Sequence, residues 1–399
     1  MKIVVAGMGI SCITMIKEIR KFSYEPQIEV FTDESRPFYW RPRLIELLAN
    51  ESDLEKITPY NIDWYENNGV ILHFSDPIVG IDTSSKKAIS RSGLTVDYDA
   101  FVFANGAMPF VLPIPGKELS NVYTLRTFED VEKIKSHYGK SKKFTIIGGG
   151  VLGIETASAL KRAGEKDVTV VEFFPYLLPR QLDTSGSAVL KFLIEKKYEL
   201  KLLLGKTTSS IEGKGSVEKI KFADGTSIDS DVVIFSAGVR PNVEIAKSSG
   251  ITVEKGIVVD DAMQTNVEDV YAIGDVAQHQ KKIYGIEPPA VEQAKVLGQI
   301  LCSKSSRYHG SVPSAILKVA GIDLLSVGEI EPNNEKSIFS SFGDMIEGFY
   351  KKVVVSDGYF VGVITIGVKR PDALKMKKLV DEKVAPSNSI VEYVKNVSF

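Results

Sequence analysis

Two glycine-rich segments, each lying between an apolar run and a predicted helix, constrain the fold of this chain more than any other feature. The first, Gly7-Met8-Gly9-Ile10-Ser11-Cys12, follows an apolar run over residues 2–6. The second, Gly148-Gly149-Gly150-Val151-Leu152-Gly153, follows an apolar run over residues 143–147. A strand, a glycine turn, a helix and a second strand form a βαβ unit, the building block of open parallel sheets. The predicted helices are residues 13–22 and 154–163, and the predicted second strands are residues 27–32 and 167–171.

The glycines of both segments have a chemical reason as well as a conformational one. In a dinucleotide-binding turn the first glycine permits the bend, the second lets the backbone approach a pyrophosphate, and the third lets the helix pack on the strand. The phosphates then lie at the helix N-terminus, where unpaired N–H groups favour anions. The first segment departs from the pattern in having Cys12 at the third position, but cysteine is small and close packing is still expected. The sequence thus predicts an α/β fold with two Rossmann-like, three-layer dinucleotide-binding domains. Their predicted turn residues are Gly7, Gly9 and Cys12, and Gly148, Gly150 and Gly153.

Two acidic residues stand where a parallel sheet would place ligand-binding carboxylates. Glu172 ends the strand after the second glycine turn, 19 residues beyond Gly153. A carboxylate there can accept both ribose hydroxyls of NADH and repels the 2′-phosphate of NADPH, so NADH is favoured. Asp275, after Gly274, follows the apolar run 270–273, at the strand end where ligands bind in such sheets. The alternative for Asp275 is a simple helix cap.

Composition excludes several other classes of function. The net charge of −2 gives no general basic field for nucleic acid, and the two cysteines lie far apart and form no CxxC motif. The four histidines are scattered and indicate no zinc or iron–sulfur ligand set. No apolar run reaches the ~18 residues of a membrane span, so we expect no membrane segment and a cytoplasmic location. Redox or group-transfer chemistry in this chain would therefore use a bound organic cofactor.

From these motifs onward the sequence resembles the flavin-dependent pyridine nucleotide-disulphide oxidoreductase superfamily. Within it, the sequence is most similar to the NADH:rubredoxin reductases and to the flavin-binding part of the assimilatory nitrite reductase large subunit. The resemblance extends over nearly the whole chain. It rests on Asp33-Glu34, Tyr39-Trp40-Arg41-Pro42-Arg43-Leu44, Ala104-Asn105-Gly106-Ala107-Met108-Pro109 with Ile114-Pro115-Gly116, and the long motif from Thr265 to Asp275.

The resemblance implies a domain organisation. FAD would be bound by the first unit, in a domain of residues 1–113 and 240–308, and NADH by an inserted domain of residues 114–239. A small α+β domain would follow over residues 310–399. Within it, the Asp-Gly turn at 357–358 predicts a hairpin over residues 349–366. Polar helices are expected near residues 371–383 and 388–396.

The resemblance also implies roles for single residues. Asp33 or Glu34 would hold the adenosine ribose of FAD, Arg41 and Pro42 would lie beside the flavin, and Asn105 stands where threonine is usual. The further cofactor-binding residues that it implies are Val79, Gly106, Gly238, Gly274, Asp275 and Ala290. The aromatic residues Tyr39, Trp40 and Trp64 are expected to fill the core.

Two residues are candidates for a catalytic role. Glu155 would lie near the meeting point of nicotinamide and flavin, although a first-turn glutamate is also favourable through the helix dipole alone. Lys318 would lie close to the flavin, where a cation stabilises the anionic reduced ring. The alternative is that Lys318 simply faces outward from its strand.

The reaction implied is hydride transfer from NADH to FAD, followed by electron delivery to a small iron protein, rubredoxin or a ferredoxin. Residues 36–50 contain no cysteine, which excludes members with a CxxxxC disulfide and disfavours those with a single redox cysteine. Two alternatives stay open. One is an NADH oxidase that reduces dioxygen to peroxide, and the other is a flavin- and NADH-bound signalling or scaffold protein similar to apoptosis-inducing factor.

Overall fold

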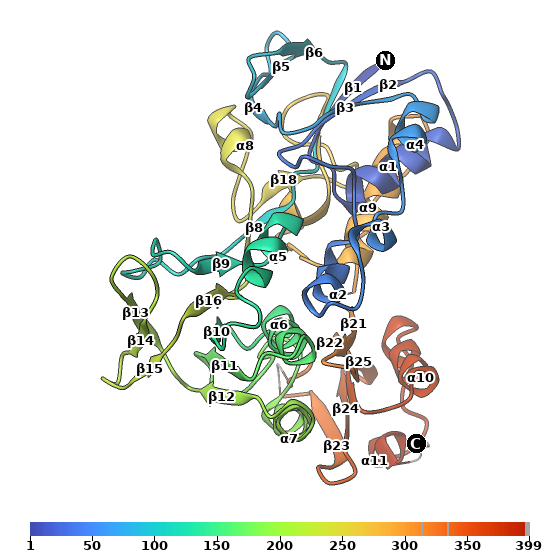
Figure 1. Cartoon of the computed structure of the whole chain (residues 1–399). Coiled ribbons are helices and arrows are strands. Elements are labelled where there is room, and N and C mark those ends of the chain that lie inside the picture. Colours follow the sequence, from blue (N-terminus) through green and yellow to red (C-terminus); the bar gives the residue numbers. More distant parts are fainter. Residues whose placement is uncertain (313, 333–334, 396–399) are drawn as a thin grey trace. The chain divides into compact units, whose positions relative to one another are not determined.

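The computed structural model describes residues 1–312, 314–332 and 335–395, and they fall into two compact units (Figure 1). Both units combine segments that are far apart in the sequence. Unit 1 consists of Met1–Arg43, Ser52–Met108 and Val239–Ser311. Unit 2 consists of Leu44–Glu51, Pro109–Gly238 and the described residues from Val312 onward. The boundaries of the FAD and NADH domains remain predictions.

Unit 1 is built on a five-stranded parallel sheet in the order β19-β7-β1-β2-β3. Helices α1 and α9 pack against each other beside it (Figure 1). Buried apolar side chains on α1 recur at helical spacing, at Cys12, Met15, Ile16 and Ile19, and this face joins the core of the unit. The strands are β1 (Lys2–Ala6), β2 (Gln27–Phe31), β3 (Val70–His73), β7 (Ala100–Phe103) and β19 (Val270–Ala272), and the helices are α1 (Ile10–Arg20) and α9 (Glu287–Ile300).

Smaller elements complete unit 1. A three-stranded antiparallel sheet contains β4 (Ile78–Asp82), β5 (Lys87–Ser90) and β6 (Thr95–Asp97), and a parallel pair contains β18 (Ile257–Val259) and β20 (Ala277–His279). The short helices are η1 (Arg41–Arg43), α3 (Leu54–Ile57), α4 (Ile62–Asn67), α8 (Glu244–Ser248) and η2 (Gly274–Val276). The short strands β8 (Ala107–Pro109) and β17 (Val239–Pro241) lie where the chain passes from one unit to the other.

Unit 2 contains a second five-stranded parallel sheet, in the order β12-β11-β10-β16-β9. Its strands are β9 (Val122–Thr124), β10 (Lys143–Ile147), β11 (Asp167–Glu172), β12 (Lys201–Leu204) and β16 (Val232–Phe235). The helices near it are α2 (Leu44–Leu48), α5 (Phe128–Lys135), α6 (Val151–Arg162) and α7 (Thr184–Tyr198). A small antiparallel sheet is formed by β13 (Thr208–Glu212), β14 (Lys219–Phe222) and β15 (Ser227–Asp229).

The last part of unit 2 is an antiparallel sheet with helices on both faces. All eight residues of β24 are buried, because α10 and α11 cover one face and α7 covers the other (Figure 1). The predicted hairpin is present, and its turn residues Asp357 and Gly358 both have positive φ, as the short hairpin turn requires. The sheet order is β21-β22-β25-β24-β23, with β21 (Ser314–Val319), β22 (Ile322–Gly328), β23 (Ile338–Asp344), β24 (Phe349–Ser356) and β25 (Tyr359–Ile366). The helices are α10 (Arg370–Asp381) and α11 (Ile390–Lys395), and residue 396 of the predicted final helix lies outside the described residues.

The helices at the glycine turns begin earlier than the sequence pattern predicted. Helix α1 begins at Ile10 rather than residue 13, and α6 begins at Val151 rather than residue 154. In both cases a glycine in extended conformation, Gly9 or Gly150, is the N-cap, so the helix begins directly after it. No helix in the described ranges is long and apolar enough to cross a membrane.

Candidate dinucleotide-binding sites

The first glycine turn, in unit 1, is shaped by the strand beside it. Gly7 has φ +101°, and a Cβ there would lie 2.5 Å from the Ala104 carbonyl oxygen at the end of β7. Its N–H donates to the carbonyl of Phe31 (2.7 Å) at the end of β2. Two residues further on, Gly9 caps α1 without a side-chain hydrogen bond, and among the described residues only its own chain neighbours have atoms within 4 Å of its Cβ position. The turn therefore presents the N-terminus of a helix with open space beside the backbone, as a phosphate requires.

Cys12 occupies the third position of this turn and is completely buried in α1. Burial raises the pKa of its thiol to about 12, so the thiol is protonated at neutral pH. A protonated, buried thiol is a poor nucleophile. Cys12 is thus a packing residue of the turn.

The Gly274–Asp275 segment meets both long helices of unit 1. The Gly274 N–H donates to Gln293 Oε1 (2.8 Å) in α9, and a Cβ at Gly274 would lie 2.9 Å from Ser11 Oγ in α1. The same point is 3.8 Å from Ala290 Cβ in the first turn of α9. Asp275 itself lies within the short helix η2 rather than at the cap of a long helix. The structure therefore brings the first turns of α1 and α9 together with the predicted Gly274-Asp275 motif. No sequence pattern indicated that Gln293 would hold Gly274.

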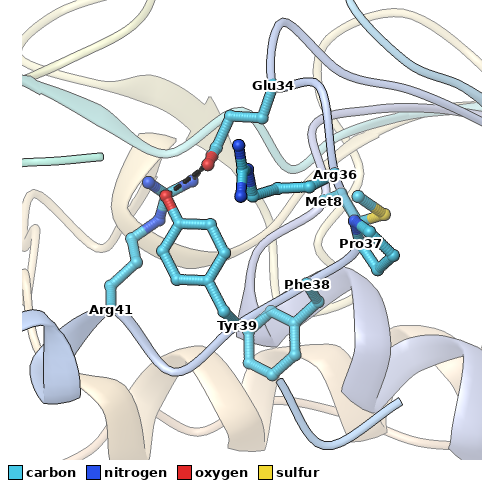
Figure 2. A pocket seen from close by; sticks show the side chains of 7 residues that line it. All are labelled: Met8, Glu34, Arg36, Pro37, Phe38, Tyr39 and Arg41. Atoms are coloured by element: carbon cyan, nitrogen blue, oxygen red, sulfur yellow. Dashed lines mark hydrogen bonds and ion pairs between the residues drawn. The ribbon is translucent and has the colours of Figure 1, made fainter. Parts of the chain in front are cut away.

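A small pocket forms where the first turn meets the segment after β2 (Figure 2). The side chains of Tyr39 and Arg41 point toward Glu34 in Figure 2, and its carboxylate accepts a hydrogen bond from the Tyr39 hydroxyl and pairs with the Arg41 guanidinium. Burial alone would lower the pKa of Arg41, but Glu34, with Tyr39 and Asp33, raises it above its ordinary value. Tyr39 is buried as expected, and it also positions Glu34, which the sequence did not indicate. The pocket is lined by Met8, Glu34, Arg36, Pro37, Phe38, Tyr39 and Arg41.

Asn105, in the segment after β7, has one paired and one unpaired polar atom in its side chain. Its amide Nδ2 donates to the Asn242 carbonyl (3.0 Å), whereas the buried Oδ1 has no hydrogen-bond partner among the described residues. Buried polar atoms are normally paired, so a ligand that donates to this oxygen would remove the penalty. Next to it, Gly106 has φ +63°. Val79, on β4, lies at a register shift between Ile78 and Gly80, and such a bulge leaves a residue out of the strand pairing.

The remaining predicted residues of unit 1 are at the surface. Asp33 is exposed at the end of β2, next to the buried Thr32. Pro42 is exposed within η1, between Arg41 and Arg43.

The second glycine turn, in unit 2, repeats the first geometry with less room. Gly148 has φ +124°, and a Cβ there would lie 2.3 Å from the Ser236 carbonyl oxygen after β16. At the third position a Cβ on Gly153 would lie only 1.9 Å from the carbonyl oxygen of Gly148. Gly150 caps α6 with open space around its Cβ position. This turn therefore accepts only glycine at its first and third positions.

Glu172, at the end of β11, is held against this turn. Its carboxylate accepts hydrogen bonds from the backbone N–H groups of Gly149 (2.5 Å) and Phe174 (2.8 Å), and the residue is 7% exposed. Each carboxylate oxygen can accept a second bond, so ribose hydroxyls can still be bound. Gly238, also predicted, has φ +96° after β16.

The two candidate catalytic residues have different environments. Burial raises the pKa of Glu155, in α6, to about 7, and the opposing effect of Arg162 is smaller. Its carboxyl group is therefore close to half protonated at neutral pH, a state suited to holding or releasing a proton. Lys318 lies on β21 with an exposed side chain, opposite Asp323 on β22. Its predicted place beside the flavin remains a prediction.

Two parallel sheets, each with a glycine turn, a helix N-terminus and an acidic strand end, define a protein that binds two dinucleotides. Residues 1–295 match the family described as pyridine nucleotide-disulphide oxidoreductase, and the chain belongs to this family. Residues 313–384 match the C-terminal domain of rubredoxin NAD+ reductases. The predicted family, the fold class and the cofactor pair FAD and NADH are thereby confirmed.

Curated relatives and solved structures agree with this assignment. The chain is 36% identical to the nitrite reductase [NAD(P)H] of Bacillus subtilis, over 92% of this chain and 45% of that protein. It is 32% identical to the NADH-rubredoxin oxidoreductase of Clostridium acetobutylicum, over 86% of both proteins. A crystal structure of NADH:rubredoxin oxidoreductase from that organism has a TM-score of 0.84 at 29% identity and covers 99% of both chains. The chain spans less than half the length of the B. subtilis nitrite reductase that it matches.

The residues of both units fit the two cofactors. In unit 1, the open space at Gly9, the unpartnered Asn105 Oδ1 and the meeting of Gly274 with α1 and α9 fit FAD. In unit 2, the space at Gly150 and the buried Glu172 carboxylate fit NADH. The contact of each single residue with a cofactor remains a prediction.

Proposed function

We propose that this chain passes electrons from NADH through FAD to a small one-electron iron protein, a rubredoxin or a ferredoxin. The observation that carries this proposal is the state of the two cysteines. Cys12 is completely buried with its pKa raised to about 12, and the Cys302 thiol donates to the backbone carbonyl of Ile19 (3.7 Å). Burial also raises the pKa of Cys302. A thiol relay beyond the flavin therefore has no residue to use, and the electrons would leave from the flavin itself.

The relatives support a protein acceptor. A relative that aligns over most of its own length is named NADH-rubredoxin oxidoreductase, and another, from Ectopseudomonas oleovorans, is named rubredoxin-NAD(+) reductase. The match of residues 313–384 to the rubredoxin NAD+ reductase C-terminal domain extends this similarity into the C-terminal part of the chain.

The chain's own residues would supply binding, orientation and charge. When bound, FAD supplies the capacity to take two electrons from NADH together and to release them singly. Glu172 would hold the ribose of NADH, and the N-terminus of α6 at Gly150 would bind its pyrophosphate. Arg41 would add positive charge near the flavin and Glu155 would hold a proton near neutral pH.

A stopped-flow panel of acceptors tests this proposal. We expect NADH to bleach the yellow protein rapidly, and we expect rubredoxin or ferredoxin to reoxidise it faster than dioxygen does. Because small iron–sulfur proteins are commonly acidic, reoxidation by them should slow as the salt concentration rises. Dioxygen consumption at the same rate with and without an iron protein would contradict the proposal.

A charge reversal separates acceptor docking from flavin chemistry. Arg43, in η1, donates to the Lys56 carbonyl (2.7 Å) and is a candidate for steering an acidic partner. Arg43→Glu should lower the association rate with the iron protein about tenfold, while flavin reduction by NADH stays nearly unchanged. Arg91→Glu is the matched control, because this substitution changes the net charge by the same amount. Arg91 is an exposed residue of the same unit and follows β5. Equal effects of the two reversals would show that only net charge matters.

One alternative has a specific observation in its favour. The chain is 31% identical, over 76% of that protein, to an NADH oxidase of Methanocaldococcus jannaschii. If this chain is an oxidase, dioxygen uptake and peroxide formation will account for all NADH consumed, whichever iron protein is present. A scaffold protein would instead show slow bleaching by NADH with every acceptor.

A further inference from the structure

A buried polar junction joins helix α7 to the C-terminal sheet within unit 2. Asp183 is the N-cap of α7, and its Oδ1 accepts a hydrogen bond from the Gly186 N–H (2.8 Å). Its other oxygen, Oδ2, accepts a hydrogen bond from the Tyr350 hydroxyl (2.6 Å) and pairs with Lys352 Nζ (2.9 Å). Asp183, Tyr350 and Lys352 are 8%, 4% and 2% exposed. One carboxylate thus fixes both the start of α7 and the position of that start on β24.

The two buried charges of the junction, on Asp183 and Lys352, are costly to bury, and each has several polar partners. Lys352 also pairs with Glu331 (3.1 Å), and its Nζ lies 4.8 Å from the centroid of the Phe339 ring. Desolvating a carboxylate and an ammonium group costs several kcal/mol per ion, and the loss of one partner leaves the other charge buried alone. Apolar packing could join a helix to a sheet without this cost. The junction therefore specifies one position of α7 on the sheet.

The position of α7 is transmitted to the glycine turn by a short segment, residues 173–182. At one end, the Glu172 carboxylate accepts hydrogen bonds from the backbone N–H groups of Gly149 and Phe174. The Leu178 N–H in turn donates to the Gly149 carbonyl (3.1 Å). At the other end, the Leu177 N–H donates to Ser187 Oγ (2.7 Å) in α7. The segment is therefore bonded both to the glycine turn and to α7. A movement of α7 would pull on the same backbone that holds Glu172.

We propose that Asp183, Tyr350 and Lys352 are positioning residues for NADH. They hold α7 on the C-terminal sheet, α7 holds residues 173–182, and this segment keeps the Glu172 carboxylate in place at the turn. The C-terminal domain would thus help to shape the nucleotide site. This inference rests on the assignment of the NADH site to unit 2 and goes beyond the proposed electron acceptor.

The strand β24 offers a matched pair of variants for the test. Lys352→Met removes the charge that faces Asp183. Lys351→Met removes the neighbouring lysine, which is 0% exposed and lies near the Phe349 ring (5.7 Å) on the opposite face of the sheet. Both variants disturb the same sheet, but only the first acts on α7. Tyr350→Phe removes a single hydrogen bond and is a milder variant.

The primary measurement is the binding of ADP-ribose to the full-length flavoprotein, followed by calorimetry or by flavin fluorescence. We expect Lys352→Met to weaken binding about tenfold and Tyr350→Phe about threefold, since each removes one bond to the Asp183 carboxylate, and Lys352→Met also leaves that buried charge without its cation. Lys351→Met should bind ADP-ribose as the unaltered chain does. In stopped-flow, the NADH concentration for half-maximal flavin reduction should rise by the same factors, with the limiting rate within about twofold. Lys352→Arg should restore part of the affinity.

The outcomes distinguish this inference from a purely structural junction and from failure of the proposed function. If Lys352→Met and Lys351→Met lower the melting temperature alike and ADP-ribose affinity is unchanged in both, the inference is wrong. If Lys352→Met does not fold, Tyr350→Phe decides by the same criterion. If no iron protein is reduced but Lys352→Met still binds ADP-ribose more weakly than Lys351→Met does, the proposed electron acceptor is wrong and the positioning role stands. An unaltered chain that binds no ADP-ribose would overturn both.

Discussion

In both glycine turns, the first glycine has a positive φ and lies against the end of a neighbouring parallel strand, at Ala104 for Gly7 and at Ser236 for Gly148. The third positions differ. A Cβ at Gly153 would lie 1.9 Å from the Gly148 carbonyl oxygen, whereas the whole side chain of Cys12 fits in its place and is fully buried. The third glycine is therefore required only where the helix approaches its own turn this closely. A departure from the motif at that position is not by itself a sign of a lost site.

The acidic residues beyond the two turns also differ in what holds them. The Glu172 carboxylate accepts hydrogen bonds from two backbone N–H groups, that of Gly149 in its own turn and that of Phe174 in the segment that follows. Glu34 is bound instead by two side chains, Tyr39 and Arg41, from the segment leading into η1. Glu172 is thus positioned by backbone groups of the residues around it, whereas Glu34 depends on side chains that must fold against it.

The largest expected difference between the turns is at their third positions. Gly153→Ala should lower the free energy of unfolding by about 3 kcal/mol or more, because the new Cβ meets backbone that cannot move aside. Cys12→Ala only shortens a buried side chain and should cost roughly 1–2 kcal/mol. Urea unfolding of both variants measures the difference. Similar losses in the two variants would mean that the turns are packed alike.

The helices after the turns differ two residues further on, where α6 has Glu155 and α1 has Thr14. Because burial raises the pKa of folded Glu155 to about 7, the folded chain binds this proton more tightly than the unfolded chain does. The stability gained from this tighter proton binding by Glu155 is complete below about pH 4.5 and is lost as the pH rises toward 7. Glu155→Gln should therefore be more stable than the unaltered chain above pH 7, by at most about 3 kcal/mol, with no gain at pH 4. Thr14→Ser is the control, and its stability relative to the unaltered chain should not change with pH. A gain for Glu155→Gln that is equal at all pH values would refute the assignment.

The two helix caps should separate the cofactors. Gly9 and Gly150 have negative φ and open space at their Cβ positions, so alanine is tolerated in the fold but projects into the space assigned to phosphate. Gly9→Ala should weaken FAD binding at least about tenfold, or 1.4 kcal/mol, and leave ADP-ribose binding nearly unchanged. Gly150→Ala should instead weaken ADP-ribose binding and leave FAD binding nearly unchanged. Flavin content and ADP-ribose titration measure both effects. If each variant weakens both ligands, the assignment of one cofactor to each turn is wrong.

The smallest effect is expected at Glu172. Glu172→Gln keeps an oxygen for one backbone N–H but removes the charge that repels the 2′-phosphate of NADPH. The ratio of kcat/KM for NADH to that for NADPH should fall several-fold, or about 1 kcal/mol. Glu172→Ala should in addition weaken both nucleotides, because the N–H groups of Gly149 and Phe174 lose their acceptor. Equal use of NADH and NADPH by the unaltered chain would contradict the assignment.

Local patterns in the sequence determined the two βαβ units, the hairpin with its Asp-Gly turn and the family, because strand, turn and helix signals depend on residues close together in the chain. The positions of Gly7, Gly148 and Gly153 could be predicted for the same reason, since their conformation is set by the turn to which they belong. The helix starts were less well predicted, because an uncharged glycine cap gives no polar capping signal.

Only the tertiary structure decided which other residues support the predicted ones. Gln293 holds Gly274 from another element, Tyr39 holds Glu34 across a turn, and Tyr350 reaches Asp183 from 167 residues away in sequence. Such partners are chosen by the order of strands in the sheets and by the helices packed on them. A glutamine, a tyrosine or a lysine inside an apolar run is compatible with many roles until the fold places a second polar group next to it.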